Sequence, residues 1–112
     1  MTTNAESAYG RPIIADLKAT VGEIKSVRFR NYDSRLVVRI NRVAIDRLDV
    51  MYQVRYRQKG GEWVTEISDR NAIKIEGLDP ETKFEVQARL YAIVGSKKFY
   101  GKWSESKMVG GS

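Results

Sequence analysis

Three arginines and a tryptophan are the side chains of this sequence whose chemistry most clearly suggests a role in binding. Arg55 and Arg57 are two residues apart, and Arg89 and Trp103 follow later in the chain. If their segments are neighbouring strands, alternation places the guanidinium groups on one outward face, beside the indole. A guanidinium stacked on an indole is a cation–π contact worth about 0.5–2 kcal/mol. The set predicts either a ladder that only stiffens a sheet or an exposed patch of the kind enriched in binding hot spots.

A second candidate lies in residues 93–102, which the sequence places in a long loop before the last strand. It gathers three lysines around two aromatic residues, namely Lys97, Lys98, Lys102, Phe99 and Tyr100. Loops carried by a rigid scaffold commonly hold binding residues. The alternative is that Phe99 or Tyr100 folds back and caps one end of the core. With the first set, these residues form the predicted partner-binding site.

The residue types exclude most catalytic chemistry. The chain has no cysteine and no histidine, so disulfides, thiolate nucleophiles, zinc fingers and imidazole bases are ruled out. Two carboxylates that are close in sequence, Asp46 and Asp49, are expected in a loop, where acidic residues serve solvation. The glycines fit turns rather than a phosphate-binding loop. We therefore predict no enzyme, no cofactor and no metal.

Composition and charge describe one soluble domain with a basic surface. The 112 residues are 42% hydrophobic and 30% charged, and the net charge is +6. No apolar run reaches the 18 or so residues of a membrane span, and no signal peptide is expected in the polar N-terminal residues. A basic surface favours an acidic protein or a glycan as partner. We expect no specific nucleic acid binding and no membrane insertion.

Alternation of apolar and polar residues dominates the chain between its two ends. It predicts seven short strands, at 23–30, 36–40, 50–56, 63–67, 73–78, 84–91 and 103–109. Short strands separated by turns predict an all-β fold, a seven-stranded antiparallel, immunoglobulin-like β-sandwich. The domain is expected to span 23–109. Residues 1–22 are expected to be a leader or linker with room for one extra strand, and 110–112 a linker or cloning scar.

The corner before the sixth predicted strand resembles the signature of fibronectin type III domains. The matching run is Leu78-Asp79-Pro80-Glu81-Thr82-Lys83-Phe84-Glu85-Val86-Gln87-Ala88, and Tyr52–Arg57, Trp63 and Trp103-Ser104 follow the family in order. Pro80 should end the preceding strand, and Thr82 should bond within the corner. Phe84 replaces the usual corner tyrosine, and Ile40 replaces a core tryptophan. Tyr52, Phe84 and Phe29 are expected to refill that volume.

The resemblance implies that the strands carrying the arginines are neighbours, and it points to two branches. The resemblance to domains of phage tail and bacterial surface proteins is weighed slightly ahead of the other. It implies a non-catalytic interaction or spacer module of a larger extracellular, surface or virion protein. A cytosolic location stays open. The alternative is a ligand-binding domain similar to the membrane-proximal domain of class I cytokine receptors. Trp103-Ser104-Glu105-Ser106-Lys107 keeps half of their Trp-Ser-x-Trp-Ser motif, and of the paired arginines Arg89 matches whereas Gln87 does not.

Overall fold

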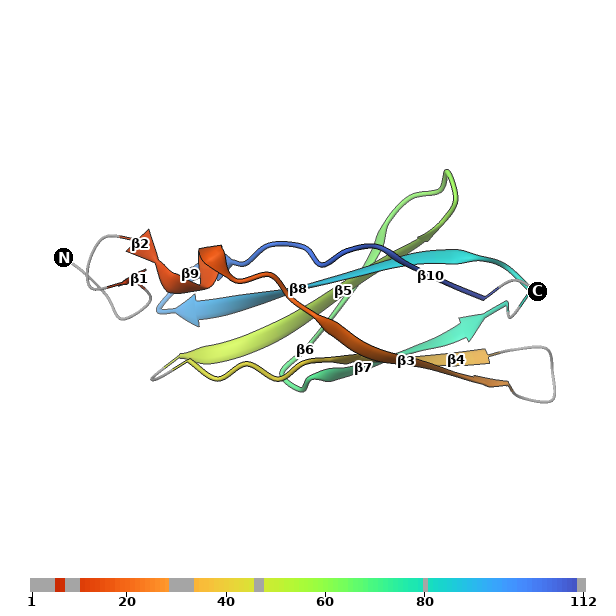
Figure 1. Ribbon diagram of the computed structural model, residues 1–112, viewed down its shortest axis with the longest axis horizontal. Coiled ribbons are helices and arrows are strands. Elements are labelled where there is room, and N and C mark those ends of the chain that lie inside the picture. Colours follow the sequence, from red (N-terminus) through yellow and green to blue (C-terminus); the bar gives the residue numbers. More distant parts are fainter. Residues whose placement is uncertain (1–5, 8–10, 29–33, 46–47, 80, 111–112) are drawn as a thin grey trace.

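Two antiparallel sheets face each other in the computed structural model, which describes residues 6–7, 11–28, 34–45, 48–79 and 81–110 (Figure 1). The smaller sheet contains β3 (Val21–Arg28), β4 (Ser34–Ile40) and β7 (Ala72–Leu78), in that order. The larger sheet has the order β10 (Lys107–Val109), β8 (Phe84–Val94), β5 (Asp49–Gln58) and β6 (Val64–Ser68), with β9 (Lys97–Tyr100) also paired to β8. The predicted all-β sandwich is confirmed, and each predicted strand has a counterpart.

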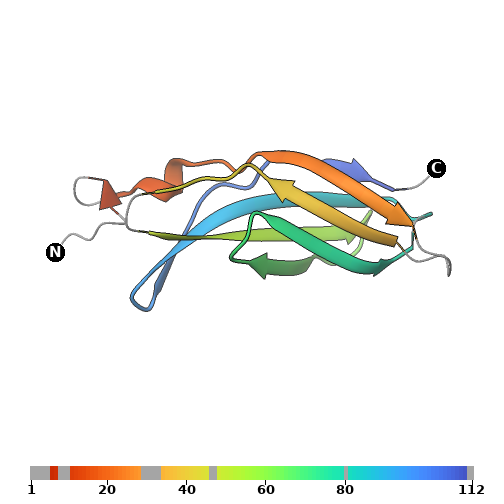
Figure 2. The same ribbon diagram turned by 90° about the horizontal axis from the view of Figure 1, so that it is seen from below.

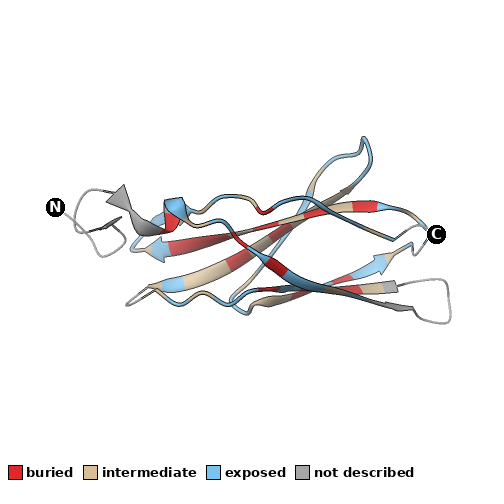
Figure 3. Ribbon diagram, viewed as in Figure 1, coloured by how far each residue is buried: buried red, intermediate tan, exposed pale blue. Residues whose placement is uncertain are grey.

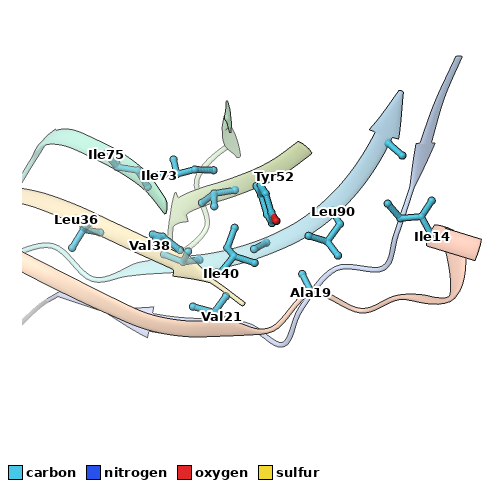
Figure 4. Close-up of a cluster of buried hydrophobic side chains, with 14 residues drawn as sticks. Ile14, Ala19, Val21, Leu36, Val38, Ile40, Tyr52, Ile73, Ile75 and Leu90 are labelled. Atoms are coloured by element: carbon cyan, nitrogen blue, oxygen red, sulfur yellow. The ribbon is translucent and has the colours of Figure 1, made fainter. Parts of the chain in front are cut away.

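Period-2 alternation decides which residues form the core. In β8, Val86, Ala88 and Leu90 are fully buried, and so is Val54 of β5. Figure 3 shows buried segments at intervals along both strands. Val38 and Ile40 of β4 meet them from the opposite sheet (Figure 4). Because successive side chains of a strand alternate between faces, the residues between these positions point outward, away from the core.

Tyr52 partly takes the place of the tryptophan that Ile40 replaces. It lies in the same buried cluster as Ile40, and its hydroxyl oxygen lies 3.3 Å from the backbone nitrogen of Val43 and 3.4 Å from the carbonyl oxygen. Phe84 is also buried but lies outside this cluster. Phe29 lies outside the described residues, so its expected contribution is not tested.

The corner before β8 is held by Asp79. Its backbone carbonyl accepts a hydrogen bond from the backbone nitrogen of Thr82 at 3.1 Å. Its carboxylate accepts bonds from the Thr82 hydroxyl at 3.2 Å and from the Glu81 backbone nitrogen at 2.9 Å. Pro80 lies outside the described residues. The expected local bonding of Thr82 is therefore observed, with the Asp79 side chain as an acceptor.

Two predicted boundaries differ from the structure in the last third of the chain. Residues 93–102 do not form a long loop, because β8 continues to Val94 and turns through Gly95-Ser96 into β9. Gly95 has a φ of 62°, the conformation that a two-residue hairpin turn requires. The last strand is also shorter than predicted, since only Lys107–Val109 pairs as β10.

The segment before β3, expected as a leader or linker, contributes to the core. Ile13–Asp16 forms the 3-10 helix η1, and Ile14 and Ala19 are buried with the inner residues of both sheets (Figure 4). The backbone nitrogen of Lys102 donates to the Leu17 carbonyl at 2.7 Å. Figure 2 shows η1 at the same end of the domain as the β8–β9 hairpin. The packed unit therefore includes residues before 23.

The backbone of Gly101 lies close against this segment. A Cβ atom at Gly101 would lie 2.7 Å from the Leu17 carbonyl oxygen and 3.0 Å from that of Ile14. Because both are backbone atoms, Gly101→Ala is expected to lower the free energy of unfolding by about 1–3 kcal/mol, as overpacking does. Urea denaturation measures this loss.

Gly22→Ala is the matched control. Its Cβ atom would also meet an oxygen at 2.7 Å, but that oxygen belongs to the exposed side chain of Asn41, which can move away. A loss below about 1 kcal/mol is expected for this surface change. Equal losses in the two variants would mean that the segment before β3 is not docked as the structure shows.

Candidate binding face

The pairing of β5 with β8 sets each arginine of the outward face directly opposite an acceptor. In this register Arg57 faces Glu85, Arg55 faces Gln87, and Arg89 faces Gln53. All three pairs share one face, since the alternating residues between them point into the core. The sequence patterns Gln-x-Arg-x-Arg in β5 and Glu-x-Gln-x-Arg in β8 therefore interlock when the strands run antiparallel.

These cross-strand partners fix the arginine side chains by hydrogen bonds. Arg55 donates from Nε and Nη2 to Gln87 Oε1 at 2.9 and 2.6 Å. Arg57 donates from Nε to Glu85 Oε1 at 3.0 Å, and Arg89 donates from Nε to Gln53 Oε1. Gln87, which does not match the receptor motif, thus holds an arginine of the neighbouring strand.

The fixed arginines alternate with aromatic rings in one stack, which we call the ladder. Its members are, in order, Arg57, Trp63, Arg55, Trp103, Arg89 and Tyr100. The Cζ atoms of Arg57 and Arg55 both lie 4.2 Å from the centroid of Trp63. Trp103 lies between Arg55 at 4.1 Å and Arg89 at 4.4 Å. Tyr100 ends the stack, 4.0 Å from Arg89.

Ser104 fixes the tryptophan that precedes it. Its backbone nitrogen donates to the Ala88 carbonyl at 2.7 Å, and its hydroxyl accepts from the Ala88 nitrogen at 2.9 Å. Gln87 Nε2 donates to the Ser104 carbonyl at 3.2 Å. One buried serine thus satisfies both backbone groups of Ala88, as a paired strand would. This bonding holds Trp103 over the arginines although its segment precedes β10.

The β8–β9 hairpin separates the residues that were predicted to form one loop patch. Tyr100 and Lys98 lie on the outward face, with Tyr100 opposite Tyr91 and Lys98 opposite Ile93. Phe99 lies opposite Ala92 and packs against the core, as the capping alternative expected. Lys97 is exposed beside the turn, and Lys102 is exposed at the junction with Leu17. Only part of the predicted loop set therefore shares the ladder's face.

Two residues of this face were not included in the predicted site. Trp63 was assigned to a strand and to the family resemblance but not to the site, and a hairpin that pairs Tyr56 with Val64 brings it beside Arg57. Tyr91 was assigned only to a strand, but it is buried beside β9, with its ring centroid 5.4 Å from that of its cross-strand neighbour Tyr100. The Nζ atom of Lys98 lies 5.7 Å from the centroid of Tyr91. Burial of Tyr91 depends on β9, a strand that the sequence pattern did not show.

The same face carries apolar side chains that remain accessible. Ile67 is 56% exposed and lies opposite Gln53 of β5, and Met108 is 52% exposed and lies opposite Glu85 of β8. Tyr100 is 40% exposed at the end of the ladder. The face thus combines rigid guanidinium groups with exposed apolar side chains, the combination found in hot spots of protein interfaces.

Glu85 links the ladder to the segment before β10. A hydrogen bond from the Ser106 hydroxyl at 2.6 Å, together with the bond from Arg57, lowers the pKa of the Glu85 carboxyl below its ordinary value. A lowered folded-state pKa means that the fold favours the ionised form. Its stabilising contribution is therefore complete above the unfolded pKa of about 4.3 and is lost as the pH falls through the folded pKa.

We expect Glu85→Gln to flatten the acid limb of the stability curve. Urea midpoints measured from about pH 6 down to about pH 3 should fall less steeply for this variant than for the parent domain. Glu105, whose pKa is lowered by its 2.6 Å bond to Lys18, titrates in both proteins and serves as the common background. Parallel curves would show that Glu85 is not stabilised in its ionised form.

Neither a metal site nor a membrane-spanning helix is found in the described part of the chain. Within it, no three acidic side chains are gathered closely enough to hold an ion. No helix there is both long and apolar enough to cross a membrane. Of the two loop carboxylates, Asp49 begins β5, and Asp46 lies outside the described residues.

The comparison with protein families identifies the chain. Residues 22–112 match the model of the cytokine receptor-like factor 2-like D2 domain. The chain belongs to this family. Trp103-Ser104, the half motif that suggested the receptor branch, lies within the matched residues. Membership supports the receptor branch of the expected resemblance rather than the phage or bacterial branch that was placed first.

A solved structure has the same fold as this D2-type domain. The chain is 17% identical to a protein chain in a structure described as "Cytokine receptor complex - Crystal form 1A", with a TM-score of 0.55. The match covers 81% of this chain and 50% of the solved chain, so our domain spans about half of that protein. At this identity the similarity shows the fold, which is of the fibronectin type III kind. No curated protein sequence matches.

Proposed function

We propose that the chain is a non-catalytic, protein-binding domain of an extracellular, cytokine-receptor-like protein. The family match carries this proposal, because a D2 domain of that family is a receptor module rather than an enzyme. The solved structure with the same fold is a cytokine receptor complex, which agrees with a binding role. The partner is then a protein, either a soluble ligand or a second receptor chain.

We place the contact at the β8–β9 hairpin and the adjoining outward face of β5 and β8. The hairpin presents Tyr100 and Lys98 at the end of a ladder that fixes the strands beneath it. A rigid surface loses little conformational entropy on binding. The outward exposure of Tyr100 also favours a binding domain over the spacer role that the sequence left open, since a spacer needs no exposed aromatic residue.

The opposite sheet provides a matched control surface. Arg39 of β4 is an exposed arginine on the outer side of the smaller sheet. It lies opposite Ala72 and Glu23, and among the described residues it is stacked on no aromatic ring. Reversing its charge therefore tests whether the loss of any exposed basic residue of the domain weakens binding.

A binding screen with kinetic follow-up tests the proposal. The biotinylated domain is tetramerised on streptavidin and screened against an array of purified secreted ligands and receptor ectodomains. For a partner that binds, Lys97→Glu with Lys98→Glu should slow association, whereas Tyr100→Ala should mainly speed dissociation. Arg39→Glu should change neither rate. Binding that survives the hairpin changes but is lost in Arg39→Glu would place the interface on the smaller sheet.

A further inference from the structure

The three arginines of the ladder are spaced evenly along the strand direction. Arg57 and Arg55 are two residues apart in β5, and Arg89 lies level with Gln53, two residues further on. Two residues of a strand span about 6.8 Å, so the arginines occupy three successive levels with this rise. Same-side residues of any extended peptide have the same spacing. A partner segment lying parallel to the strands would place every second side chain over an arginine.

Each of these arginines keeps part of its hydrogen-bonding capacity for a partner. Within the described part of the chain, the bonds to Gln87, Glu85 and Gln53 use the three Nε atoms and Nη2 of Arg55. The other Nη atoms of these arginines donate no hydrogen bond to the described residues. The Arg57 side chain is 34% exposed. Carboxylates are the protein groups that match such a fixed, planar donor edge best.

The apolar side chains beside the row distinguish between two anionic partners. Ile67 lies level with Arg89, and Met108 lies level with Arg57, each on a strand next to the arginine row. A sulfated glycan offers little apolar surface to cover these exposed side chains, whereas a protein segment offers both carboxylates and apolar groups. The face therefore fits a protein.

We propose that the ladder receives an extended acidic segment of the protein partner, which lies along β5 and β8 with carboxylates at three alternate positions. This inference rests on the proposed function and specifies the chemistry of the partner. Because the ladder fixes the guanidinium planes before binding, the segment would meet preorganised donors, and little side-chain entropy would be lost. The ladder would then be the recognition surface itself as well as a stiffener of the sheet.

Two synthetic octapeptides of equal composition test the spacing. One alternates glutamate with threonine, and the other carries four glutamates followed by four threonines. They are titrated into the isotopically labelled domain while nuclear magnetic resonance follows the arginine Nε–H and tryptophan indole signals. The alternating peptide should bind about fivefold more tightly than the block peptide and should shift the signals of Arg55, Arg57, Arg89 and both tryptophans.

Variants of Arg57, the end member of the ladder, test whether the peptide binds at the ladder while the rest of the stack stays in place. Arg57 ends the stack, so Arg57→Gln removes one cation and leaves Trp103 between its two arginines. It should weaken the alternating peptide about three- to tenfold, the loss expected for one charge-assisted contact at a surface. Arg57→Lys should lie between this variant and the parent. Arg39→Gln should have no effect, and amide spectra confirm that each variant is folded.

Three results would overturn the inference. Equal affinity for the two peptides, with Arg39→Gln weakening both, would indicate unspecific attraction to the basic domain. Tighter binding of a heparin-derived hexasaccharide at the same signals would make the face a glycan site. Failure of both peptides to bind at millimolar concentration would exclude an acidic segment, and the proposed function would still stand if the hairpin variants lost the screened partner.

Discussion

Phe84→Ala is expected to lower the free energy of unfolding by about 3–5 kcal/mol, the usual cost of truncating a buried aromatic side chain. Phe84 is 7% exposed and begins β8 on the same face as the fully buried Val86. Its ring packs edge-on against Tyr56, with 6.2 Å between centroids. Urea denaturation with unchanged slope would measure the loss.

Two further substitutions of Phe84 test separately the contribution of its apolar volume and the effect of an added hydroxyl group. Phe84→Leu should cost clearly less than alanine, because more of the apolar volume remains. Phe84→Tyr would restore the hydroxyl of the usual corner residue, and one new hydrogen bond would stabilise by about 0.5–1.5 kcal/mol. A loss below about 1 kcal/mol for Phe84→Ala would mean that this residue does not belong to the core, on the same large-to-small scale.

Trp103→Ala is the second large change that we expect, with a loss of about 2–4 kcal/mol. The indole is only half-buried, so the expected loss lies toward the lower end of the range for aromatic truncation, with two cation–π contacts added. Those contacts join Arg55 of β5 to Arg89 of β8 through one ring. Removing the ring leaves both guanidinium groups without their shared partner. The unfolding free energy in urea again provides the measurement.

A double-mutant cycle isolates the stacking contribution from the lost apolar area. Trp103→Ala and Arg89→Gln are measured singly and together, and a coupling of about 0.5–1 kcal/mol is expected for stacked, partly exposed partners. Trp103→Phe, which keeps a smaller ring between the arginines, should retain part of the stability. Additive single losses would show that the ladder is a geometric arrangement without energetic coupling.

The ladder's central part could be predicted from the sequence because it needs only alternation and the strand neighbours that the family resemblance implied. Once β5 and β8 are paired, period 2 puts Arg55, Arg57 and Arg89 on one face, and the structure confirms that Trp103 lies between Arg55 and Arg89. Arg57 lies over Trp63 instead. That contact follows from the register of the β5–β6 hairpin, which composition and alternation do not specify.

The parts that were not predicted depend on contacts between distant segments. Ile14 is fully buried although its neighbourhood has no clear strand or helix pattern, because η1 docks over Gly101, far along the chain. β9 is only four residues long, and its pairing with β8 places Phe99 inward and Tyr100 outward. Short elements of this kind carry too few residues for a period to be recognised.

Hydrogen exchange of the complex with a partner found in the screen tests most directly whether this face binds. The domain is labelled in deuterated buffer with and without the partner, and protection is read by mass spectrometry for each segment. We predict slower exchange in β8, β9 and β5, with the largest change in the hairpin that carries Lys98 and Tyr100, and unchanged exchange in β4 and β7. Protection confined to β3, β4 and β7, with the hairpin unchanged, would contradict the account.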